Sequence, residues 1–324
     1  MTASATLPTC ATRRDSLLRD PQEHAGQLSG WEQHYEQISC GAFRSRLVEI
    51  DLAGIHIFEE TLEQAVFQTG RCGADVIALG VFSQLSGEAR WHGMSVGLDD
   101  VLFLDSRSEL LLSTPKHSTL YAVDVPVAVI EPWCEQTPLS VRDSAHRLAA
   151  TPLHNLVAAQ RLREGLRAVI GELLLRPEET VPANVSGRLR DEFVMLVADL
   201  LQGEPHPREK ASAGKAKEVV RRARAYALER RDAPPTLLEL CRHTHVSPRT
   251  LQYCFQSVLG ESPASCMKML RLNGARSELK RPGASDRVSE VAANWGFWHL
   301  SQFAADYRRM FGELPSATRA SRSN

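Results

Sequence analysis

Two groups of polar side chains near the C-terminus have the chemistry to read base edges in DNA. The first group comprises Arg249, Thr250, Gln252, Tyr253 and Gln256. The second comprises Trp298, His299, Ser301 and Gln302. Arginine can donate two hydrogen bonds to guanine in the major groove, and glutamine can pair with adenine in the same way. Such side chains most often only face water, and Trp298 could instead pack against a turn, so the elements that carry them decide their role.

The first group lies on the second of two short helices that the sequence predicts. Thr236 and Glu239 have the spacing of a capping box, in which the hydroxyl and the carboxylate each accept a bond from a free amide. Ser247 followed by Pro248 is typical of a helix start, because serine caps free amides and proline has no amide to satisfy. A short helix, a tight turn and a helix with a polar outer face together predict a helix-turn-helix unit.

The same pattern returns after a longer predicted helix, which runs from residue 263 to about residue 280. The segment Gly260–Pro263 closes the first unit and Gly312–Ser316 closes the second, and both begin with Gly-Glu. Leu251 and Phe303 occupy equivalent places 52 residues apart. A rigid helix between the two units could set their recognition helices about 34 Å apart, which is one turn of DNA.

Charge is distributed unevenly along the chain, although the net charge is −1. Residues 208–324 contain 21 Lys and Arg against 11 Asp and Glu, whereas the remainder contains 17 against 28. A basic segment joined to an acidic partner is typical of a nucleic-acid-binding module. Some cations of this segment are candidates for phosphate contacts, although they could also form surface ion pairs. These candidates are Arg276, Lys280, Arg308 and Arg309.

Several motifs within residues 216–319 are shared with a known family. They are Ser247-Pro248-Arg249-Thr250-Leu251, Phe255, Gly260-Glu261-Ser262-Pro263, Arg271-Leu272-Asn273-Gly274-Ala275, Trp295-Gly296-Phe297-Trp298-His299-Leu300-Ser301-Gln302-Phe303 and Phe311-Gly312-Glu313-Leu314-Pro315-Ser316. This set closely resembles the AraC/XylS family of bacterial regulators. The resemblance implies that a tandem helix-turn-helix domain binds a double-stranded DNA operator, and that an N-terminal domain senses a small molecule, dimerises, or does both. Ala304-Ala305 departs from the family, where many members carry Arg, and this bears on how much base readout the second unit contributes.

The N-terminal part is predicted to be rich in strands and to end in two helices. Short apolar runs separated by Gly, Asp, Ser and Pro recur through residues 43–126, a spacing suited to an antiparallel sheet or a cupin-like barrel. Apolar side chains then recur every three or four positions, which predicts helices over 153–175 and 185–201. The predicted fold class is therefore α+β, with a strand-rich sensor domain and an all-α DNA-binding domain.

The expected domain boundaries follow from the composition of the connecting segments. Residues 1–24 have no apolar core and are expected to form a disordered tail. Residues 25–204 are the expected domain for effector sensing and dimerisation. Residues 205–214 contain two prolines and no apolar cluster, which favours an interdomain linker. The DNA-binding domain is expected over residues 215–320.

Several classes of protein are not expected. No apolar run reaches the roughly 18 residues of a membrane span. The seven cysteines include no Cys-x-x-Cys pair, which argues against a disulfide framework and a zinc site, and His56, His92 and His117 lack the tight grouping of metal ligands. No phosphate-binding glycine loop, nucleophile elbow or His-Glu-x-x-His motif occurs, so no catalytic residue is expected. We expect a bacterial cytoplasmic protein, nucleoid-associated when bound to DNA, without a cofactor other than its effector.

The effector is predicted from resemblances. Gly30-Trp31-Glu32-Gln33-His34-Tyr35 and the segment Glu49–Glu60 are similar to regulators of ethanolamine operons, and Gly296–Phe303 also resembles regulators of aromatic-acid catabolism. The implied function is activation of a catabolic operon together with RNA polymerase, in response to ethanolamine alone or with adenosylcobalamin. The alternatives are an aromatic carboxylic acid effector, or a constitutive architectural protein without an effector, and a homodimer remains open. Weak candidates for the effector pocket are Trp91, Phe58 and Glu60.

Overall fold

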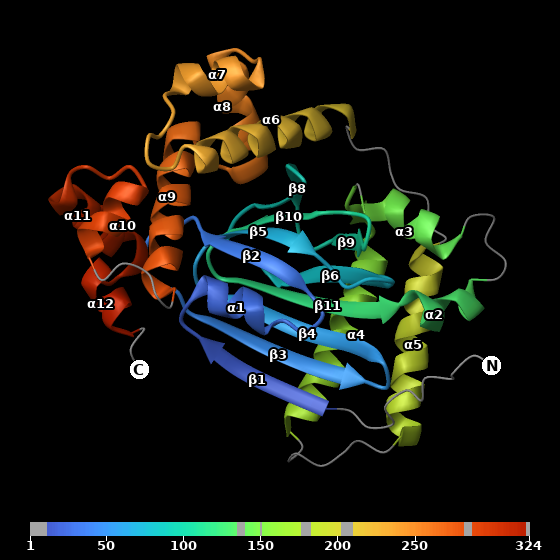
Figure 1. Cartoon of the computed structure of the whole chain (residues 1–324). Coiled ribbons are helices and arrows are strands. Elements are labelled where there is room, and N and C mark those ends of the chain that lie inside the picture. The colour runs from blue at the N-terminus through green and yellow to red at the C-terminus, as the bar shows by residue number, and fades with distance from the viewer. Residues whose placement is uncertain are drawn as a thin grey trace, which may run out of the picture.

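The computed structural model describes residues 12–134, 140–149, 151–175, 183–201, 210–281 and 287–321. Within these residues, two antiparallel sheets and their helices form the N-terminal half, and helices alone form the C-terminal half (Figure 1). The predicted α+β fold class is confirmed, with a two-sheet N-terminal domain and an all-α C-terminal domain.

The first sheet has seven strands and the second has five. The first follows the order β1 (Thr12–Leu18), β3 (Ser45–Leu52), β4 (Ile55–Leu62), β11 (Ser118–Pro126), β6 (Val76–Gln84), β9 (Asp100–Asp105) and β12 (Leu153–His154). The second follows the order β2 (Glu32–Gln37), β5 (Val66–Arg71), β10 (Leu110–Thr114), β7 (Ala89–Trp91) and β8 (Met94–Val96). Every recorded pairing is antiparallel, but only β3–β4 and β7–β8 are consecutive in the chain, so most neighbouring strands are joined by longer connections.

The central strands of the seven-stranded sheet, β6, β9 and β11, are buried on both faces and are apolar at most positions. In β4, Ile57 belongs to the cluster beneath the N-terminal domain's long helices, whereas Phe58 packs on the opposite face. In β6, Leu79 and Phe82 divide in the same way between the helix side and the second sheet. Since successive side chains of a strand point to opposite faces, burial of both faces removes the usual apolar–polar alternation.

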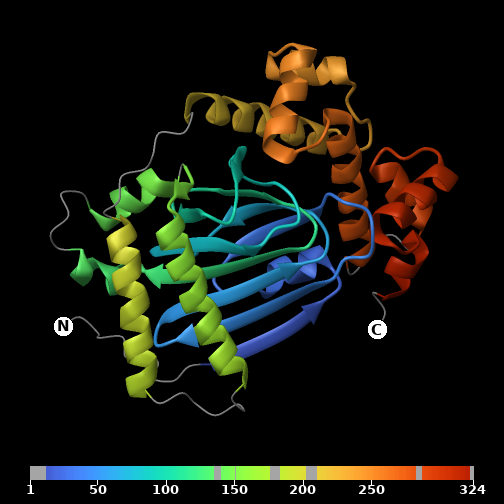
Figure 2. The ribbon, with the colours of Figure 1, turned by 180° about the vertical axis from the view of Figure 1, so that it is seen from behind.

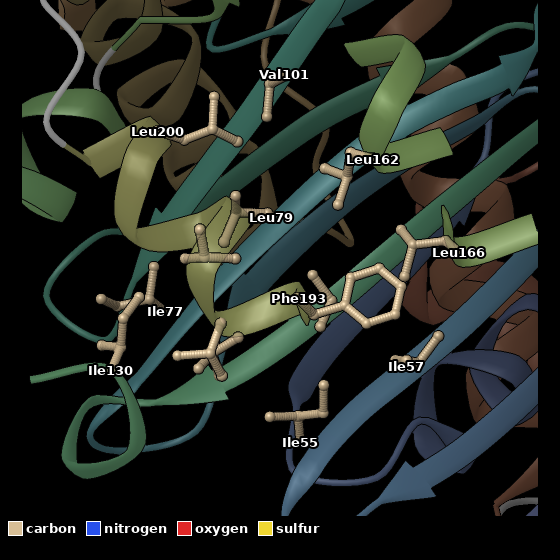
Figure 3. Close-up of a cluster of buried hydrophobic side chains, with 14 of the residues drawn as sticks. Ile55, Ile57, Ile77, Leu79, Val101, Ile130, Leu162, Leu166, Phe193 and Leu200 are labelled. Atoms are coloured by element: carbon tan, nitrogen blue, oxygen red, sulfur yellow. The ribbon is translucent and has the colours of Figure 1, made fainter. Parts of the chain in front are cut away.

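Most helices of the N-terminal domain cover the outer face of the first sheet. They are α2 (Val127–Ile130), the 3-10 turn η1 (Glu131–Trp133), α3 (Val141–Ala149), α4 (Leu156–Leu175) and α5 (Ala183–Leu201). Helix α1 (Pro21–Gln27) instead packs against β2 on the opposite side of that sheet (Figures 1 and 2). Figure 3 shows Leu162 and Leu166 of α4 and Phe193 of α5 above Ile57 and Leu79 of the sheet. Both long helices were predicted, and α4 begins at Leu156 because residues 153–154 pair with β9 as a strand.

The expected disordered tail over residues 1–24 is wrong for the residues that the structure describes. All seven residues of β1 pair with β3 although most of their side chains face water, because the ladder uses only backbone groups. Asp20 then caps α1, and its carboxylate is buried. Residues 1–11 lie outside the described residues.

Seven helices form the part of the C-terminal domain that the structure describes. They are α6 (Lys210–Glu229), α7 (Leu237–Thr244), α8 (Pro248–Leu259), α9 (Pro263–Lys280), α10 (Val288–Asn294), α11 (Leu300–Phe311) and α12 (Pro315–Ala320). The linker expected over residues 205–214 needs correction, since α6 already includes residues 210–214. Both prolines of the expected linker, Pro205 and Pro207, precede residue 210. Residues 210–214 contain no proline and can therefore belong to a helix.

Buried polar contacts join the two halves. Asn273 on α9 donates to the carbonyl of Gln37 at 2.9 Å, and the Gln37 amide donates back to Asn273 Oδ1 at 3.1 Å. Arg224 on α6 lies 2.5 Å from the buried carboxylate of Glu36. Figures 1 and 2 show α9 beside the end of β2 and α6 next to the second sheet. The C-terminal domain is therefore docked on the five-stranded sheet and is not merely tethered to it.

Candidate DNA-binding surface

Local caps set the geometry of the first helix-turn-helix unit. The Thr236 hydroxyl accepts the amide of Glu239, and the Glu239 carboxylate accepts the amide of Thr236 at 2.8 Å, which confirms the predicted capping box. His245 ends α7 in the left-handed conformation, and Ser247 caps α8 with Pro248 at its first position. These caps turn the chain sharply between α7 and α8, as the unit requires.

The first group of candidate base contacts lies on the outer face of α8. Leu251 and Phe255 are fully buried on the inner face, so the side chains of Arg249, Gln252 and Tyr253 point to solvent and are exposed. Two other candidates are partly engaged within the helix. Thr250 bonds Ser247 Oγ at 2.9 Å and Gln256 donates to the carbonyl of Gly260 at 3.0 Å. Arg249, Gln252 and Tyr253 therefore offer the strongest base-reading set in this unit.

The second group lies at the start of α11. Phe303 and Tyr307 are buried, and Ser301 and Gln302 are exposed beside them. Trp298 is 70% exposed, so it does not pack against the helix turn in this structure. His299 occupies the N-cap position of α11 and is also exposed. The second unit thus presents its candidates in the same outward manner as the first.

Helix α9 joins the two units and is packed from both sides. It has 18 residues, so it is about 27 Å long. Its Gly274 lies against the Trp295 ring, where a Cβ atom would meet Cη2 at 2.0 Å. Arg271 lies 4.6 Å from the Phe297 ring and donates to the carbonyl of Gly296 at 3.2 Å. Gly296 has a φ of +69°, the left-handed conformation expected for a residue that ends a helix. These contacts make α9 a rigid connection between the recognition helices.

Two of the four candidate phosphate contacts are engaged inside the protein. Arg276 is only 8% exposed, and its guanidinium lies 3.0 Å from Asp20 and 2.5 Å from Glu313. Lys280 lies 2.8 Å from the same oxygen of Asp20. The expected phosphate role of Arg276 is therefore not met in this conformation, because burial and its acidic partners remove it from solvent.

The two remaining candidates, Arg308 and Arg309, are exposed on α11. Arg309 lies 2.8 Å from Asp306, and both cations belong to the last turn of the helix. Their exposure beside the second recognition helix keeps them available to a phosphate backbone, which is the geometry that positions a protein on DNA without reading its sequence.

The three candidate pocket residues line one cavity between the two sheets. Trp91, Phe58 and Glu60 come from β7 and β4, and the cavity holds about 40 Å³ of free space. Trp91 donates to the carbonyl of Ala149 at 3.1 Å. The cavity is smaller than the few hundred Å³ typical of a drug-sized ligand site.

Glu60 is held by a network that the sequence did not reveal. His24 and Gln68 bond its two oxygens at 2.8 and 2.9 Å, and Tyr35 donates a further bond. Burial would raise the pKa of Glu60, but hydrogen bonds and charge from His24, with bonds from Tyr35 and Gln68, outweigh it and lower the pKa. The alternation Trp31, Gln33, Tyr35 is a strand signal that could have placed Tyr35 on β2 beside the cavity.

Other classes of site are not found among the described residues. They include no group of three or more His, Cys, Asp or Glu side chains that could hold a metal ion. The cysteines that the structure describes are free thiols. Of the helices placed in the structure, none combines the length and apolarity needed to cross a membrane.

Comparison with known proteins connects this geometry to regulators of transcription. Residues 240–321 match the protein-family profile described as Helix-turn-helix domain. The chain is 39% identical over 99 residues to the probable thc operon regulatory protein of Rhodococcus erythropolis, and the match covers 30% of each chain. It is 28% identical over 243 residues to the XylDLEGF operon transcriptional activator 1 of Pseudomonas putida, covering 72% of each chain.

A solved structure is also similar to part of the chain. It is described as a probable AraC family transcriptional regulator from Rhodopseudomonas palustris CGA009, is 34% identical, and covers 32% of this chain and 97% of that chain with a TM-score of 0.30. The chain spans only about 30% of the length of the Rhodococcus relative that it matches. These relatives are named as an operon regulatory protein and an operon transcriptional activator, and residues 240–321 of this chain are a helix-turn-helix domain.

Proposed function

We propose that this protein activates transcription of a catabolic operon by binding a specific DNA sequence through α8 and α11. The observation that carries the proposal is the pair of outward polar faces on two helices joined by the rigid helix α9. A relative from Pseudomonas putida is named as an operon transcriptional activator, which supports activation as the outcome. Activation implies a contact with RNA polymerase, and a homodimer would place four recognition helices on one operator.

The test of this function is a comparison of specific and random DNA. The full chain is mixed with a random-sequence duplex library, bound duplexes are selected through several rounds, and the affinity of the selected duplex is measured by gel shift at fixed salt. A sequence-specific regulator should prefer the selected duplex by about a thousandfold or more over random DNA. Equal affinity for both would contradict specific recognition and leave an architectural DNA-binding role.

The N-terminal domain is the proposed sensor, and ethanolamine is the first candidate effector. The cavity between the sheets is small and carries the carboxylate of Glu60, which suits a small cationic amine better than a larger acid. Adenosylcobalamin is far larger than this cavity, so any contribution from it would need another site. Regulation would then follow from a population shift, in which the effector favours the form that engages the operator.

Effector specificity is tested by thermal unfolding of the full chain with candidate ligands. Ethanolamine, with and without adenosylcobalamin, is compared with benzoate at equal concentrations. A rise in melting temperature with ethanolamine supports the amine, because a ligand of the native state stabilises it by mass action. A rise only with benzoate would contradict the amine and favour the aromatic acid.

A further inference from the structure

The N-terminal domain contacts the C-terminal end of the second recognition helix. The carbonyl of Met310 is among the last carbonyls of α11, which have no partner inside the helix. The side-chain amide of Gln37 donates to this carbonyl at 2.7 Å, and the backbone amide of Gly41 donates to it at 3.1 Å. Ala42 lies against Gly312, where an added Cβ atom would meet Ala42 Cβ at 3.1 Å. One loop of the N-terminal domain thus holds the C-terminal end of α11.

Gln37 is the residue at the centre of this contact. Its side chain is fully buried, and its amide nitrogen also lies 2.7 Å from the carbonyls of Ser39 and Gly41, which shape the loop around it. Its backbone forms the two hydrogen bonds to Asn273 of α9 that join the domains. A single residue at the end of β2 therefore fixes α11 in relation to α9.

A second contact holds the first recognition helix in an equivalent way. Strands β7 and β8 are joined by the two-residue turn His92-Gly93, in which both residues have a positive φ. A Cβ atom added to Gly93 would meet Val258 Cγ2 of α8 at 3.2 Å, so the turn lies directly on that helix (Figure 1). The Arg90 guanidinium lies beside Gly260, the C-cap residue of α8. The N-terminal domain therefore touches both recognition helices at their C-terminal ends.

Both contacts lie away from the candidate base contacts. Arg249 and Ser301 belong to the first turns of α8 and α11, whereas Val258 and Met310 belong to the last turns. The two positions on each helix are nine residues apart, which corresponds to about 14 Å of helix. Arg249 and Ser301 remain exposed in the docked arrangement. The N-terminal domain therefore holds the recognition helices without covering these side chains.

The placement of the two helices decides whether both can engage DNA at once. Two binding units on one chain gain affinity from each other only when the geometry allows simultaneous contact. Successive major grooves on one face of DNA are about 34 Å apart, so the distance and the direction of the helices must both match. Helix α9 sets the distance between the units. A contact at the far end of each recognition helix also sets its direction, because two fixed points define a line.

We propose that Gln37 and Arg90 are positioning residues for DNA recognition, through which the N-terminal domain sets the spacing at which α8 and α11 engage two half-sites. Neither residue contacts DNA in this role, and each acts through the C-terminal end of a recognition helix. The N-terminal domain is then a brace for the DNA-reading helices in addition to being the proposed sensor. The inference rests on the proposed function, since it requires that both helices read DNA.

The test compares the selected operator with a duplex that carries one extra base pair between its two half-sites. The insertion moves one half-site by about 3.4 Å and rotates it by about 34°. Gel shift should show that the wild-type full chain binds the altered duplex about tenfold more weakly or worse, because only one helix can then engage its half-site. In Gln37→Met, which keeps the length of the side chain but removes its donors, this ratio should shrink to about threefold or less. The ratio does not depend on the fraction of folded protein, so a mere loss of stability would leave it unchanged.

Arg90→Met tests the contact with the first recognition helix in the same way, and it should also reduce the ratio. Its matched control is Arg71→Met, which removes the same charge from an exposed position at the end of β5 in the same sheet. The control should keep the wild-type ratio. An unchanged ratio in Gln37→Met or in Arg90→Met would overturn the role of that residue, and an equal change in Arg71→Met would indicate a general charge effect and overturn the role of Arg90.

Hydrogen exchange of the full chain tests the brace without DNA. In Gln37→Met, the amides of residues 308–316 should exchange about tenfold faster than in the wild type, because the end of α11 loses its partner and opens more often. The amides of α7, which Gln37 does not contact, should be unchanged. Equal exchange of residues 308–316 in the two proteins would overturn the brace. Equal binding of selected and random DNA by the wild type would instead defeat the proposed function, and the exchange result would still report on the contact itself.

Discussion

Arg249 offers the clearest single side chain for base recognition. It is exposed in the first turn of α8, next to a capped helix start that fixes the local backbone. An arginine that reaches a guanine makes two charge-assisted hydrogen bonds, which carry both energy and geometric specificity.

Replacement of Arg249 by alanine should weaken operator binding by about 1–3 kcal/mol and relax the preference at one base position, because the bidentate contact is lost. Gel-shift titrations against the selected operator and its single-base variants measure both effects. Arg161→Ala is the control, since Arg161 is exposed on α4 in the other domain. Unchanged operator affinity in Arg249→Ala would show that α8 does not read bases as proposed.

His56 is a second residue whose effect can be measured, here on the stability of the folded protein. It lies between two buried carboxylates, with Nδ1 3.1 Å from Asp124 and Nε2 3.3 Å from Glu49. Burial lowers the pKa of His56, but hydrogen bonds and charge from Asp124 and Glu49 outweigh it and raise the pKa to about 9. His56 is therefore protonated at neutral pH.

The raised pKa of His56 predicts a loss of stability in alkali. Its contribution is fully present below the unfolded pKa of about 6.5 and is lost as pH rises through about 9, with a total of roughly 3 kcal/mol. Denaturant unfolding of the wild type and His56→Gln from pH 6 to 10 measures this difference, which should shrink with rising pH. His154→Gln, at a half-exposed histidine, is the control and should change little. A difference that stays constant over this range would contradict the assignment.

At the scale of elements, α9 determines how the two helix-turn-helix units are placed. Its Gly274 allows the Trp295 ring to pack directly against the helix backbone. Trp295 also donates to Glu278 at 2.8 Å, so the ring is fixed at the end of α10. The spacing between the recognition helices therefore depends on a residue that lacks a side chain.

Gly274→Ala should destabilise the C-terminal domain by about 1–3 kcal/mol, because its Cβ would overlap the buried Trp295 ring. Gly171→Ala is the matched control, since a Cβ at this position of α4 has nothing within 4 Å. The control should be neutral or more stable by about 0.5–1 kcal/mol, as expected when glycine is replaced within a helix. Urea unfolding followed by circular dichroism distinguishes the two, and similar effects in both variants would contradict the packing argument.

At the scale of the whole molecule, charged groups of one domain are neutralised by the other. Asp20 holds Arg276 and Lys280, and Glu36 holds Arg224. Burial raises the pKa of Glu36, but charge and hydrogen bonds from Arg224 and His34 outweigh it and lower the pKa to about 2. The domain interface is thus stabilised by ionised carboxylates.

This interface should weaken in acid. The contribution of Glu36 is present above its unfolded pKa of about 4.5 and is lost as pH falls toward about 2, with a full value of roughly 3 kcal/mol. Glu36→Gln should therefore destabilise the full chain at pH 7, and the difference from wild type should shrink between pH 5 and pH 3 in thermal unfolding. Glu290→Gln, in an exposed pair on α10, should have little effect. A pH-independent difference would contradict the role of the Glu36 charge.

Local features of this protein could be read from its sequence. The capping box of Thr236 and Glu239, the Ser247-Pro248 helix start and the left-handed Gly296 involve residues only a few positions apart. Their conformations follow from backbone hydrogen bonding and steric limits that act within one or two turns. The two helix-turn-helix units and their outward polar faces were therefore predictable from spacing alone.

The contacts between distant segments were decided only by the tertiary structure. Arg276 has the sequence context of an exposed helical cation, yet its partner Asp20 lies 256 residues away and buries it. The strand β1 has few buried side chains and is ordered by its backbone pairing with β3. Its sequence has no apolar–polar periodicity that would have predicted this strand. The contact at the end of α11 likewise joins distant segments, since Gln37 lies 273 residues before Met310. Burial and ion pairing depend on which surfaces meet, and a local pattern carries no information about a partner so far away in the chain.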